Sequence, residues 1–535
     1  MKKTKVIIGI IVLMFSLSIV SASNEFDMGD VQDLNTELMD YDEEYSELDS
    51  EIEIFDNNPY ATEGFNETMP DRTEVYSGGI HNGTYANPDK TSINSSDVPS
   101  RDSNYQVGIN YPNNIYQTEY LMACLKDSNG YVIQQAGMPF KFVINNVNYT
   151  RVTNEYGLAR IQINLVAQPT PYTININFNG YGSYPTITGY ISLKVYQRET
   201  RVTPITFYLN QYDNFQFKVT DNTGVPLNNK TTTITINNVN YTRRTNQYGI
   251  ANITIRLDPN KYNISFQCNQ QLGCQASSKT IELTVNSNIT RVKTLIKALT
   301  TYVTTGNKFE VKLTDVNNVA LSGKSVKFYI NNVLYSRTTG SNGTAGVNIN
   351  LNQGTYSFSV SFIGDSNYDC SSVYTLIHNS NSAKNNVHNI SNITEYMERS
   401  DYKCDYSSPY IQSLSSELVY SCNSNLEKII SIYNYVHRIN GVDYSNSTYY
   451  SLGTLLGFVG NCADHSNAFI SLARSNSIPV LYVVGFCDVG GHEWCQVCID
   501  NTWIVCEVTN TLILGEWNTA NPDYQNLNYT CLSSY

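Results

Sequence analysis

The C-terminal part of this chain shows the clearest helical periodicity. Between residues 426 and 436, apolar side chains recur at positions i, i+3, i+4 and i+7, as on the buried face of an amphipathic helix. Apolar residues between positions 457 and 475 recur at spacings that suit a more deeply buried helix. A glycine-rich turn leads into this second helix, which we therefore expect to begin at or next to Cys462. We expect the two helices to pack against each other.

Strands are predicted to follow the second helix. Residues 478–484 form a β-branched and apolar run that predicts a strand ended by Gly485. Residues 492–499 alternate like a strand, and residues 503–508 predict the strand that returns beside it. The residues between them, 500–501, are Asp-Asn, which is typical of a two-residue hairpin turn. The pattern therefore predicts an α+β domain.

The middle of the chain contains an internal repeat. The segment Asn-Asn-Val-Asn-Tyr-Thr-Arg-x-Thr-Asn-x-Tyr-Gly begins at Asn145 and recurs from Asn237. A looser copy begins at Asn331, so successive copies stand about 93 residues apart. This spacing is close to the length of one β-sandwich of immunoglobulin size, which needs ~100 residues. In each copy the Asn-Asn pair predicts a hairpin turn, and the Asn-x-Tyr-Gly segment predicts a turn that leads into another strand.

Together these patterns predict a multidomain protein, in which all-β immunoglobulin-like sandwich repeats precede an α+β domain. Val, Ile and Tyr alternate with Asn and Thr through the repeats, as expected of half-exposed antiparallel strands. An Asn- and Ser-rich segment predicts a linker before the last domain. The predicted units are three repeats, this linker and the C-terminal domain, in that order: residues 104–197, 198–286, 287–380, 381–395 and 396–535.

The N-terminus has the features of an export signal. Three lysines within the first five residues precede an apolar run over residues 6–20, and Ser21-Ala22-Ser23 follows. We expect cleavage after Ala22, which makes residues 1–22 a signal peptide. The alternative is a signal anchor that stays in the membrane, although the run is short for a span of ~20 residues.

Composition limits the classes of function. The chain has 535 residues and a formal net charge of −13, so its charge does not attract nucleic acid and we expect no such partner. Residues 23–103 are acidic and poor in apolar clusters, which predicts a disordered spacer, with a weak helix over residues 31–48 as the alternative. We expect a secreted or cell-surface protein that contacts a membrane only if its signal is uncleaved.

Twelve cysteines in an exported chain favour disulfides. Cys268 and Cys274 are close enough in sequence to close a small loop, and Cys404 with Cys422 forms a second candidate pair. If Cys462 is a free nucleophile, the other eleven cysteines cannot all pair with one another. At least one more must then stay reduced, pair between chains or bind metal.

Four of the cysteines form a C-x7-C-x2-C-x7-C pattern that invites a zinc site: Cys487, Cys495, Cys498 and Cys506. Cys495 and Cys498 stand at an odd offset on a predicted strand, so their side chains face opposite sides, whereas structural zinc pairs usually come from turns. We therefore expect no cofactor to be required. The pattern leaves dependence on a divalent cation and the oligomeric state open.

The predicted chemistry centres on Cys462. A thiolate is the nucleophilic form of cysteine, and the partial positive charge at a helix N-terminus favours it over the thiol. His492 begins a predicted strand and Glu507 lies on the next, so a tight hairpin brings these two near pairing distance. Nucleophile, base and orienting acid then follow in the chain order Cys462, His492, Glu507.

Other side chains compete for these roles. His465 lies three residues after Cys462 on the same helix face, but its side chain would project away from a substrate, so we expect it to be structural. His437 lies on the first helix and is expected to be solvated. Asp464 is expected to accept hydrogen bonds from amides at the helix start. The remaining alternatives for the acid are Asp488, Glu493 and Asp500.

Several short segments carry a family resemblance through their order and spacing: Gly460-Asn461-Cys462-Ala463-Asp464, Leu472-Ala473-Arg474, Ile478-Pro479, Gly491-His492-x-Trp494, Trp503, and an acid before Val508-Thr509. Together they resemble the transglutaminase-like cysteine peptidase superfamily. Within it they are most similar to the pseudomurein endoisopeptidases and to the transglutaminase-like domains of adhesin-like surface proteins in methanogenic archaea. The resemblance covers roughly residues 400–520. That family usually has Asp where this chain has Glu507.

The resemblance implies a papain-like α+β fold and a cysteine peptidase that forms an acyl-enzyme. It also implies a substrate, the isopeptide bond to the lysine side chain in pseudomurein wall peptides. The upstream repeats resemble the bacterial-type immunoglobulin-like repeats of invasin- and intimin-like surface proteins, which implies a stalk that carries the last domain away from the cell. Two other functions stay open. One is a surface adhesin with a degenerate transglutaminase-like domain, and the other is a transglutaminase that cross-links a surface protein.

Overall fold

The computed structural model describes most of the chain after its first hundred residues, in one compact unit. The described ranges are 105–110, 115–304, 306–352, 354–380, 403–441, 449–487, 490–509 and 528–532. The predicted signal peptide, acidic spacer and linker lie outside the described residues, as does Asp488. No helix within the described ranges is long and apolar enough to cross a membrane.

The first module consists of two facing antiparallel sheets. One has the strand order β1 (Tyr105–Asn110), β3 (Tyr120–Asp127), β6 (Ala159–Gln162). The other has the order β5 (Val147–Val152), β4 (Pro139–Ile144), β7 (Tyr172–Tyr181), β8 (Tyr184–Leu193). A short parallel pair, β2 (Ile115–Tyr116) with β9 (Val195–Tyr196), adds to these. Alternate side chains point inward and form the core, where Phe140, Phe142 and Phe178 are fully buried.

The second module repeats this plan. Its smaller sheet has the order β10 (Thr200–Pro204), β12 (Asn214–Asp221), β15 (Ile250–Thr254). Its larger sheet has the order β11 (Tyr208–Asn210), β17 (Ser277–Asn286), β16 (Asn260–Cys268), β13 (Thr231–Ile236), β14 (Val239–Arg244).

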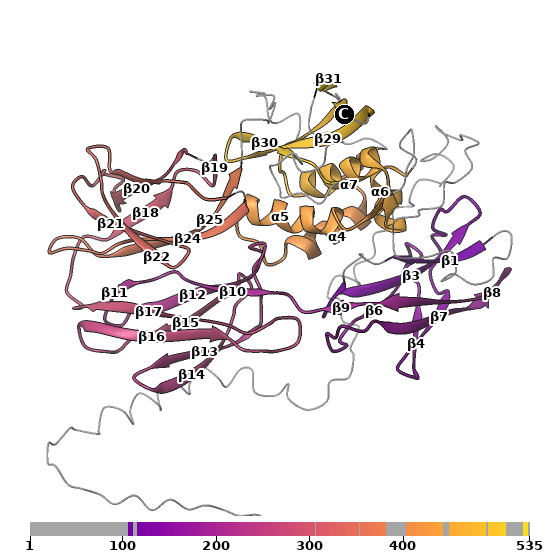
Figure 1. Cartoon of the computed structure of the whole chain (residues 1–535), viewed down its shortest axis with the longest axis horizontal. Coiled ribbons are helices and arrows are strands. Elements are labelled where there is room, and N and C mark those ends of the chain that lie inside the picture. Colours follow the sequence, from indigo (N-terminus) through magenta and orange to yellow (C-terminus); the bar gives the residue numbers. More distant parts are fainter. Residues whose placement is uncertain are drawn as a thin grey trace, which may run out of the picture. The chain divides into compact units, whose positions relative to one another are not determined.

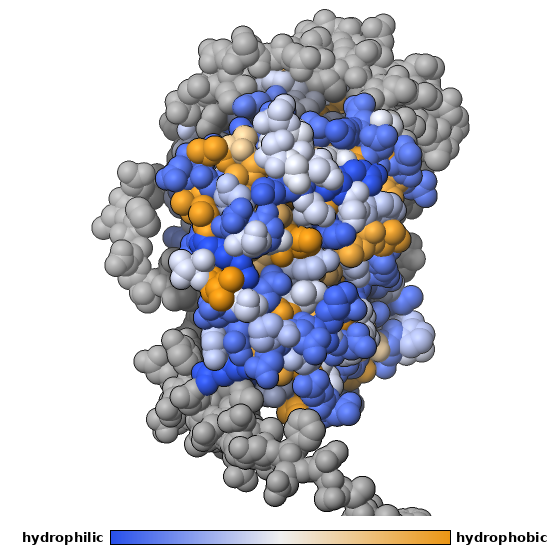
Figure 2. Space-filling model, turned by 90° about the vertical axis from the view of Figure 1, so that its left-hand side faces the viewer, coloured by the Kyte–Doolittle hydropathy of each residue, from blue (hydrophilic) through white to orange (hydrophobic). Residues whose placement is uncertain are grey.

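The third module has the same two sheets as the second. The smaller is β18 (Thr294–Ala298), β20 (Lys308–Asp315), β23 (Thr344–Asn348). The larger is β19 (Tyr302–Thr304), β25 (Ser371–Ser380), β24 (Gly354–Phe362), β21 (Ser325–Ile330), β22 (Val333–Thr338). The β-sandwich class predicted for the repeats is confirmed. On the face shown in Figure 2, apolar residues lie in small groups among polar ones, so the apolar surface there is broken up.

The turns of the sequence repeat have the predicted geometry. Asn145 and Asn146 both have positive φ, at 49° and 64°, and so do the equivalent Asn pairs of the other two modules. This is the two-residue turn that matches the twist of a tight hairpin, here β4–β5 with Ile144 opposite Val147. Gly157 of the Asn-x-Tyr-Gly turn has φ +76°, and a Cβ atom there would lie 2.1 Å from the Ile133 carbonyl oxygen. Glycine is therefore the residue that this turn accommodates.

In its described residues, the C-terminal domain combines four helices with a four-stranded antiparallel sheet (Figure 1). The helices are α4 (Pro409–Val419), α5 (Asn425–Val436), α6 (Tyr450–Gly457) and α7 (Cys462–Arg474). The sheet has the order β30 (Thr502–Cys506), β29 (Gly490–Ile499), β28 (Val480–Cys487), β31 (Asn528–Leu532), and β26 (Asn440–Gly441) pairs with β27 (Val459–Gly460). Helix α7 packs on β28 and β29 and against α4, α5 and α6. Every residue of α7 except Cys462 is buried.

The predicted helices and the hairpin are confirmed, but two strand ends differ. β28 continues past Gly485 to Cys487, because its pairing with β29 extends that far. β30 ends at Cys506, which is the last residue paired with β29, opposite Cys495. Glu507 therefore follows the strand on which it was expected to lie.

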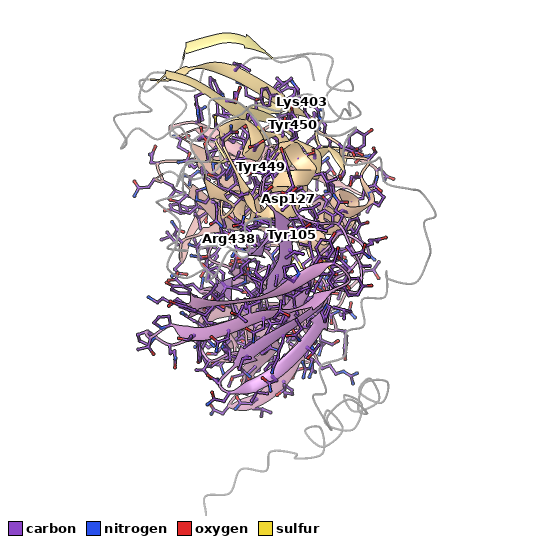
Figure 3. All side chains as sticks on the ribbon, turned by 90° about the vertical axis from the view of Figure 1, so that its right-hand side faces the viewer. Tyr105, Asp127, Lys403, Arg438, Tyr449 and Tyr450 are labelled. Atoms are coloured by element: carbon purple, nitrogen blue, oxygen red, sulfur yellow. The ribbon has the colours of Figure 1, made fainter. Side chains whose placement is uncertain are left out.

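The sandwich modules pack against the C-terminal domain. Lys218 of β12 and Glu427 of α5 form a buried ion pair, with a nitrogen–oxygen distance of 2.6 Å and side chains that are each 4% exposed. Arg438 makes two 3.0 Å hydrogen bonds to Glu119 of the first module. Figure 3 labels Arg438, which lies on the side where the first module and the C-terminal domain meet. A stalk that only carries the last domain, as the resemblance implies, would not need such contacts.

Candidate active site

The N-terminus of α7 is fixed by a network around Asp464, which is fully buried. The side chain of Asn461 accepts a hydrogen bond from the Asp464 backbone N–H, and Asp464 accepts one from the Asn461 N–H in return. The other carboxylate oxygen of Asp464 accepts from the backbone N–H groups of Tyr449 and Tyr450, at 3.1 and 2.9 Å. This capping box confirms the predicted role of Asp464 at the helix start. Cys462 is consequently the first residue of α7, where unpaired N–H groups give a partial positive charge.

The Cys462 side chain faces strand β29. It is half-buried, and its Sγ lies 3.6 Å from Oε2 of Glu493. The imidazole of His492, the preceding residue of β29, also interacts with Cys462, whose sulfur raises the pKa of the ring. Two neighbouring side chains of β29 therefore contact the sulfur.

His492 and Glu507 form a buried pair. Their Nε2 and Oε2 atoms are 2.5 Å apart, and the side chains are 6% and 1% exposed. Because Nε2 bonds to Glu507, Nδ1 is the ring nitrogen left for Cys462. Burial opposes a charged ring, but the Glu507 carboxylate and the Cys462 sulfur raise the pKa of His492 to about 11. Burial likewise opposes a charged Glu507, but His492 and Thr509 hold the pKa of Glu507 below its ordinary value.

Thr509 and Tyr433 position Glu507, a role that the sequence analysis assigned to neither of them, and His437 lies beside Tyr433. The backbone N–H of Thr509 donates to Oε1 of Glu507 at 2.7 Å, and the Thr509 hydroxyl donates to the same oxygen. The Tyr433 hydroxyl of α5 donates to the Glu507 carbonyl oxygen at 3.1 Å. His437 stacks on Tyr433, with ring centroids 5.6 Å apart. Tyr433 is recognisable from sequence only as an apolar-face residue of its helix, because nothing in the pattern identifies the partner of its hydroxyl.

The structure also places the competing candidates. His437 is not solvated as predicted, because it is half-buried at the end of α5, and burial lowers the pKa of its ring. His465 is buried, with Nδ1 2.7 Å from the Asn461 carbonyl oxygen and Nε2 3.1 Å from the Ile439 carbonyl oxygen, so its predicted structural role is confirmed. Asp500 lies in the β29–β30 turn and accepts a hydrogen bond from the Thr301 hydroxyl, away from the imidazole.

Neither of the two candidate disulfides forms among the described cysteines. Cys495 is buried and its thiol contacts the Ser466 carbonyl oxygen at 3.6 Å. Within the described ranges, no group of three or more His, Cys, Asp or Glu side chains could hold a metal ion. The Cys268 and Cys274 sulfurs lie 3.7 Å apart as thiols, whereas Cys404 and Cys422 are not joined by a disulfide.

A cysteine at a helix start, with a buried histidine–carboxylate pair on the adjacent hairpin, is the arrangement of a papain-like cysteine site. Residues 412–508, which contain all three side chains, match the family model of the transglutaminase-like superfamily. The C-terminal part of this chain therefore contains a transglutaminase-like domain. None of the curated proteins compared with this chain matches it.

Many solved structures match parts of this chain, with low scores in the matches given below. One is a Ca²⁺-stabilized adhesin with which an Antarctic bacterium binds ice, at 16% identity over 51% of this chain and 73% of that one, with a TM-score of 0.16. A protein of Cytophaga hutchinsonii described as a candidate cysteine protease matches at 15% identity over 39% and 67%, with a TM-score of 0.23. The FN1–FN3 domains of chicken CNTN1 match at 8% identity over 51% and 98%, with a TM-score of 0.18. Scores this low add nothing to the assignment of the site.

Proposed function

We propose that this chain is an exported, cell-surface cysteine hydrolase that cleaves amide or isopeptide bonds through an acyl-enzyme on Cys462. The observation that carries the proposal is the buried His492–Glu507 pair, whose imidazole also contacts the sulfur of Cys462. A carboxylate that orients an imidazole beside a nucleophile is the shared logic of cysteine and serine hydrolases.

The proposed reaction begins with a thiolate–imidazolium pair of Cys462 and His492. The thiolate attacks the amide carbonyl, and the backbone N–H of Cys462, which lies in the first turn of α7 where N–H groups lack intrahelical partners, stabilises the oxyanion. His492 then gives its proton to the leaving amine while Glu507 holds the ring in place. The thioester finally transfers its acyl group to water. No metal or other cofactor takes part in this scheme.

The proposed substrate is the peptide part of pseudomurein, cut at the isopeptide bond to a lysine side chain. This choice is supported by the motif resemblance around Cys462 and His492 and by an N-terminus with the features of an export signal. Secretion would bring the transglutaminase-like domain to such a wall substrate. A surface protein is the alternative substrate, and nucleic acid is not expected as a partner because of the net charge of −13.

The test compares the full chain with its Cys462→Ala variant on purified pseudomurein. We expect the parent to release free amino groups and the variant to lose this activity by at least about 10³-fold. Equal release by both proteins would refute the proposal. Adding EDTA to the parent measures the dependence on divalent cations that the sequence leaves open.

Labelling with iodoacetamide tests activation of the thiol before the substrate is known. We expect Cys462 to react at pH 7, and to react much more slowly in the His492→Ala variant. Cys370 is the internal control because it is also half-buried, but burial and the neighbouring Asp213 and Asp369 raise its pKa to about 11. An unreactive Cys462 would instead favour a surface adhesin with a degenerate domain.

A transglutaminase that cross-links proteins is the other alternative, because an amine can replace water as the acceptor of the acyl group. Incubation of the parent with casein and a fluorescent alkylamine separates the two activities. Covalent labelling of casein would favour cross-linking, whereas soluble peptides released from pseudomurein without labelled protein would favour hydrolysis.

A further inference from the structure

The carboxyl group of Glu493 lies beside the sulfur that the proposed reaction acylates. Its Oε2 is 3.6 Å from Sγ of Cys462, on the strand that also carries His492. The Ser466 hydroxyl of α7 donates to the Glu493 carbonyl oxygen at 3.4 Å, which ties β29 to the helix of the nucleophile. The Tyr482 hydroxyl of β28 hydrogen-bonds to the Glu493 side chain. Glu493 is thus held from two neighbouring elements with its carboxyl group at the reacting atom.

The second half of the proposed reaction needs a group that accepts a proton. Water or an amine that attacks the thioester loses a proton as the new bond forms. Burial opposes a charged His492, but the Glu507 carboxylate and the Cys462 sulfur raise the pKa of His492 to about 11. Once the sulfur is acylated, it no longer contributes to this rise in the pKa of His492. The larger contribution to the rise, from the Glu507 carboxylate, remains. The Glu507 carboxylate therefore still favours a protonated ring in the acyl-enzyme, and a second proton acceptor beside the thioester would serve the attacking water.

We propose that Glu493 is a second catalytic residue, which takes the proton from the attacking water or amine when the acyl-enzyme on Cys462 breaks down. This inference rests on the proposed function, because Glu493 has no such step without an acyl-enzyme. The oxygen of water forms a bond to the thioester carbon, and its proton passes to the Glu493 carboxylate. The carbon–sulfur bond then breaks, Cys462 leaves as the thiolate, and the product is a carboxylic acid. The acid product and Glu493 finally return their protons to solvent, while the imidazolium of His492 pairs again with the thiolate.

The surroundings of Glu493 suit a proton acceptor. Burial raises its pKa above the ordinary value of 4.5, and the Asp464 carboxylate of α7 adds to this rise. The Tyr482 hydroxyl of β28, the Cys462 thiol of α7 and the His492 ring of β29 act in the opposite direction. A base works best when its pKa lies near the working pH, and a carboxyl group with a raised pKa approaches that condition.

The competing explanation is that Glu493 only positions Cys462. p-Nitrophenyl acetate separates the two, since its leaving group needs no acid, so the burst of p-nitrophenolate reports acylation and the steady-state rate reports deacylation. In the Glu493→Gln variant, which keeps the size of the side chain, we expect the burst to change by less than about threefold. We expect the steady-state rate to fall about 10²-fold or more, as for loss of a general base. Hydroxylamine attacks thioesters without the help of a base and should restore most of the lost turnover.

The matched control is Glu282→Gln, which removes an exposed carboxylate of the second module that pairs with Lys261. It should leave both the burst and the steady-state rate at parental values. Glu493→Asp keeps a carboxylate nearby and should retain a steady-state rate between those of the parent and Glu493→Gln. Thermal unfolding of each variant confirms that it is folded.

The pH profile of the parent is a further measurement. It tests the inference even if a variant does not fold. The steady-state rate should rise with pH as Glu493 loses its proton, with a midpoint above 4.5, and this limb should be missing in Glu493→Gln. An unchanged steady-state rate in Glu493→Gln, an equal loss of burst and steady state without rescue by hydroxylamine, or a parental profile without this limb would overturn the inference. A parent whose burst does not depend on Cys462 would instead refute the proposed function, so the two failures are distinguishable.

Discussion

At the scale of single residues, Glu507 explains how a longer acid serves where the resembling family usually has Asp. Pairing between β29 and β30 ends at Cys506, so the acid starts one residue beyond the last cross-strand pair. Its extra methylene extends the side chain by about 1.5 Å. Tyr433 holds the Glu507 carbonyl oxygen and Thr509 holds Oε1, which leaves Oε2 directed at His492. The departure from the family is therefore accommodated by the local backbone.

Replacing this acid by Glu507→Gln tests its role. The amide keeps the length of the side chain but removes the charge that raises the pKa of His492, so the ring pKa should fall from about 11 towards its ordinary value. We expect kcat for amine release to fall roughly 10³- to 10⁴-fold, as when the acid of a triad is replaced by its amide. NMR titration of the ring reports the pKa, and initial rates report kcat. Unchanged values of both would contradict the assignment of Glu507 as the orienting acid.

The same pair predicts how stability depends on pH. The pKa of His492 is raised, so its contribution is fully present below the ordinary value of 6.5 and is lost as pH rises towards about 11. The pKa of Glu507 is lowered, so its contribution is present above 4.5 and is lost as pH falls below that value. The difference in unfolding free energy between the parent and Glu507→Gln should therefore be largest between pH 4.5 and 6.5 and shrink by pH 10. Urea unfolding at pH 5.5, 8 and 10 measures it, and a difference that does not vary with pH would contradict this linkage.

At the scale of elements, the start of α7 decides where the nucleophile lies. Asp464→Asn should destabilise the protein by about 1–3 kcal/mol, since a buried acceptor of several backbone N–H groups loses its charge. It should also slow iodoacetamide labelling of Cys462, because the helix start shifts. Ser424→Ala is the matched control, as Ser424 caps α5 in the same kind of box but far from the thiol. This control should cost about 1 kcal/mol in urea unfolding with unchanged labelling. Equal labelling of Cys462 in both variants would show that the cap does not position it.

The elements also show what could be predicted from sequence. The Asn-Asn hairpins and the two helices were predictable, because left-handed Asn pairs and apolar spacing are local properties. The end of β30 and the partners of Glu507 were not, because they depend on pairing with β29 and on the Tyr433 hydroxyl of a distant helix. Hairpin spacing placed His492 near Glu507 and chain order added Cys462 as the nucleophile, but neither could show that Glu493 reaches the same sulfur. That contact depends on how α7 packs on the sheet.

At the scale of the whole molecule, the sequence repeat predicted sandwiches but not their packing on the C-terminal domain. A sequence repeat indicates the fold of each module. The interface between a module and the C-terminal domain depends instead on side chains that are far apart in the chain. Buried apolar residues of the first and third modules, including Leu158 and Leu376, belong to the same hydrophobic cluster as the core of the C-terminal domain. Val225 of the second module packs against that cluster. The modules therefore contribute to the environment of the helices that carry the site.

The ion pair between Lys218 and Glu427 offers the sharpest test of this packing. Glu427 also accepts hydrogen bonds from the backbone N–H groups of Asn423 and Ser424 at the start of α5, so the module and the helix share one carboxylate. Lys218→Met leaves that carboxylate buried without its cation, and we expect a loss of about 3–5 kcal/mol in urea unfolding. Glu427→Gln should also destabilise, and the double variant should lose less than the sum of the two.

The exposed pair Lys261–Glu282, with side chains 64% and 57% exposed, provides the control cycle within the second module. Solvent screens such a pair, and holding its two side chains in one geometry costs conformational entropy. Its coupling free energy should therefore be far smaller than that of Lys218 and Glu427. If the two cycles gave equal coupling, the second module would not be packed on α5 in solution. A strong coupling confined to Lys218 and Glu427 would mean that loosening this module also perturbs α5, whose Tyr433 holds the Glu507 backbone. Lys218→Met should then lower kcat as well as stability, although Lys218 lies in a different domain from Cys462.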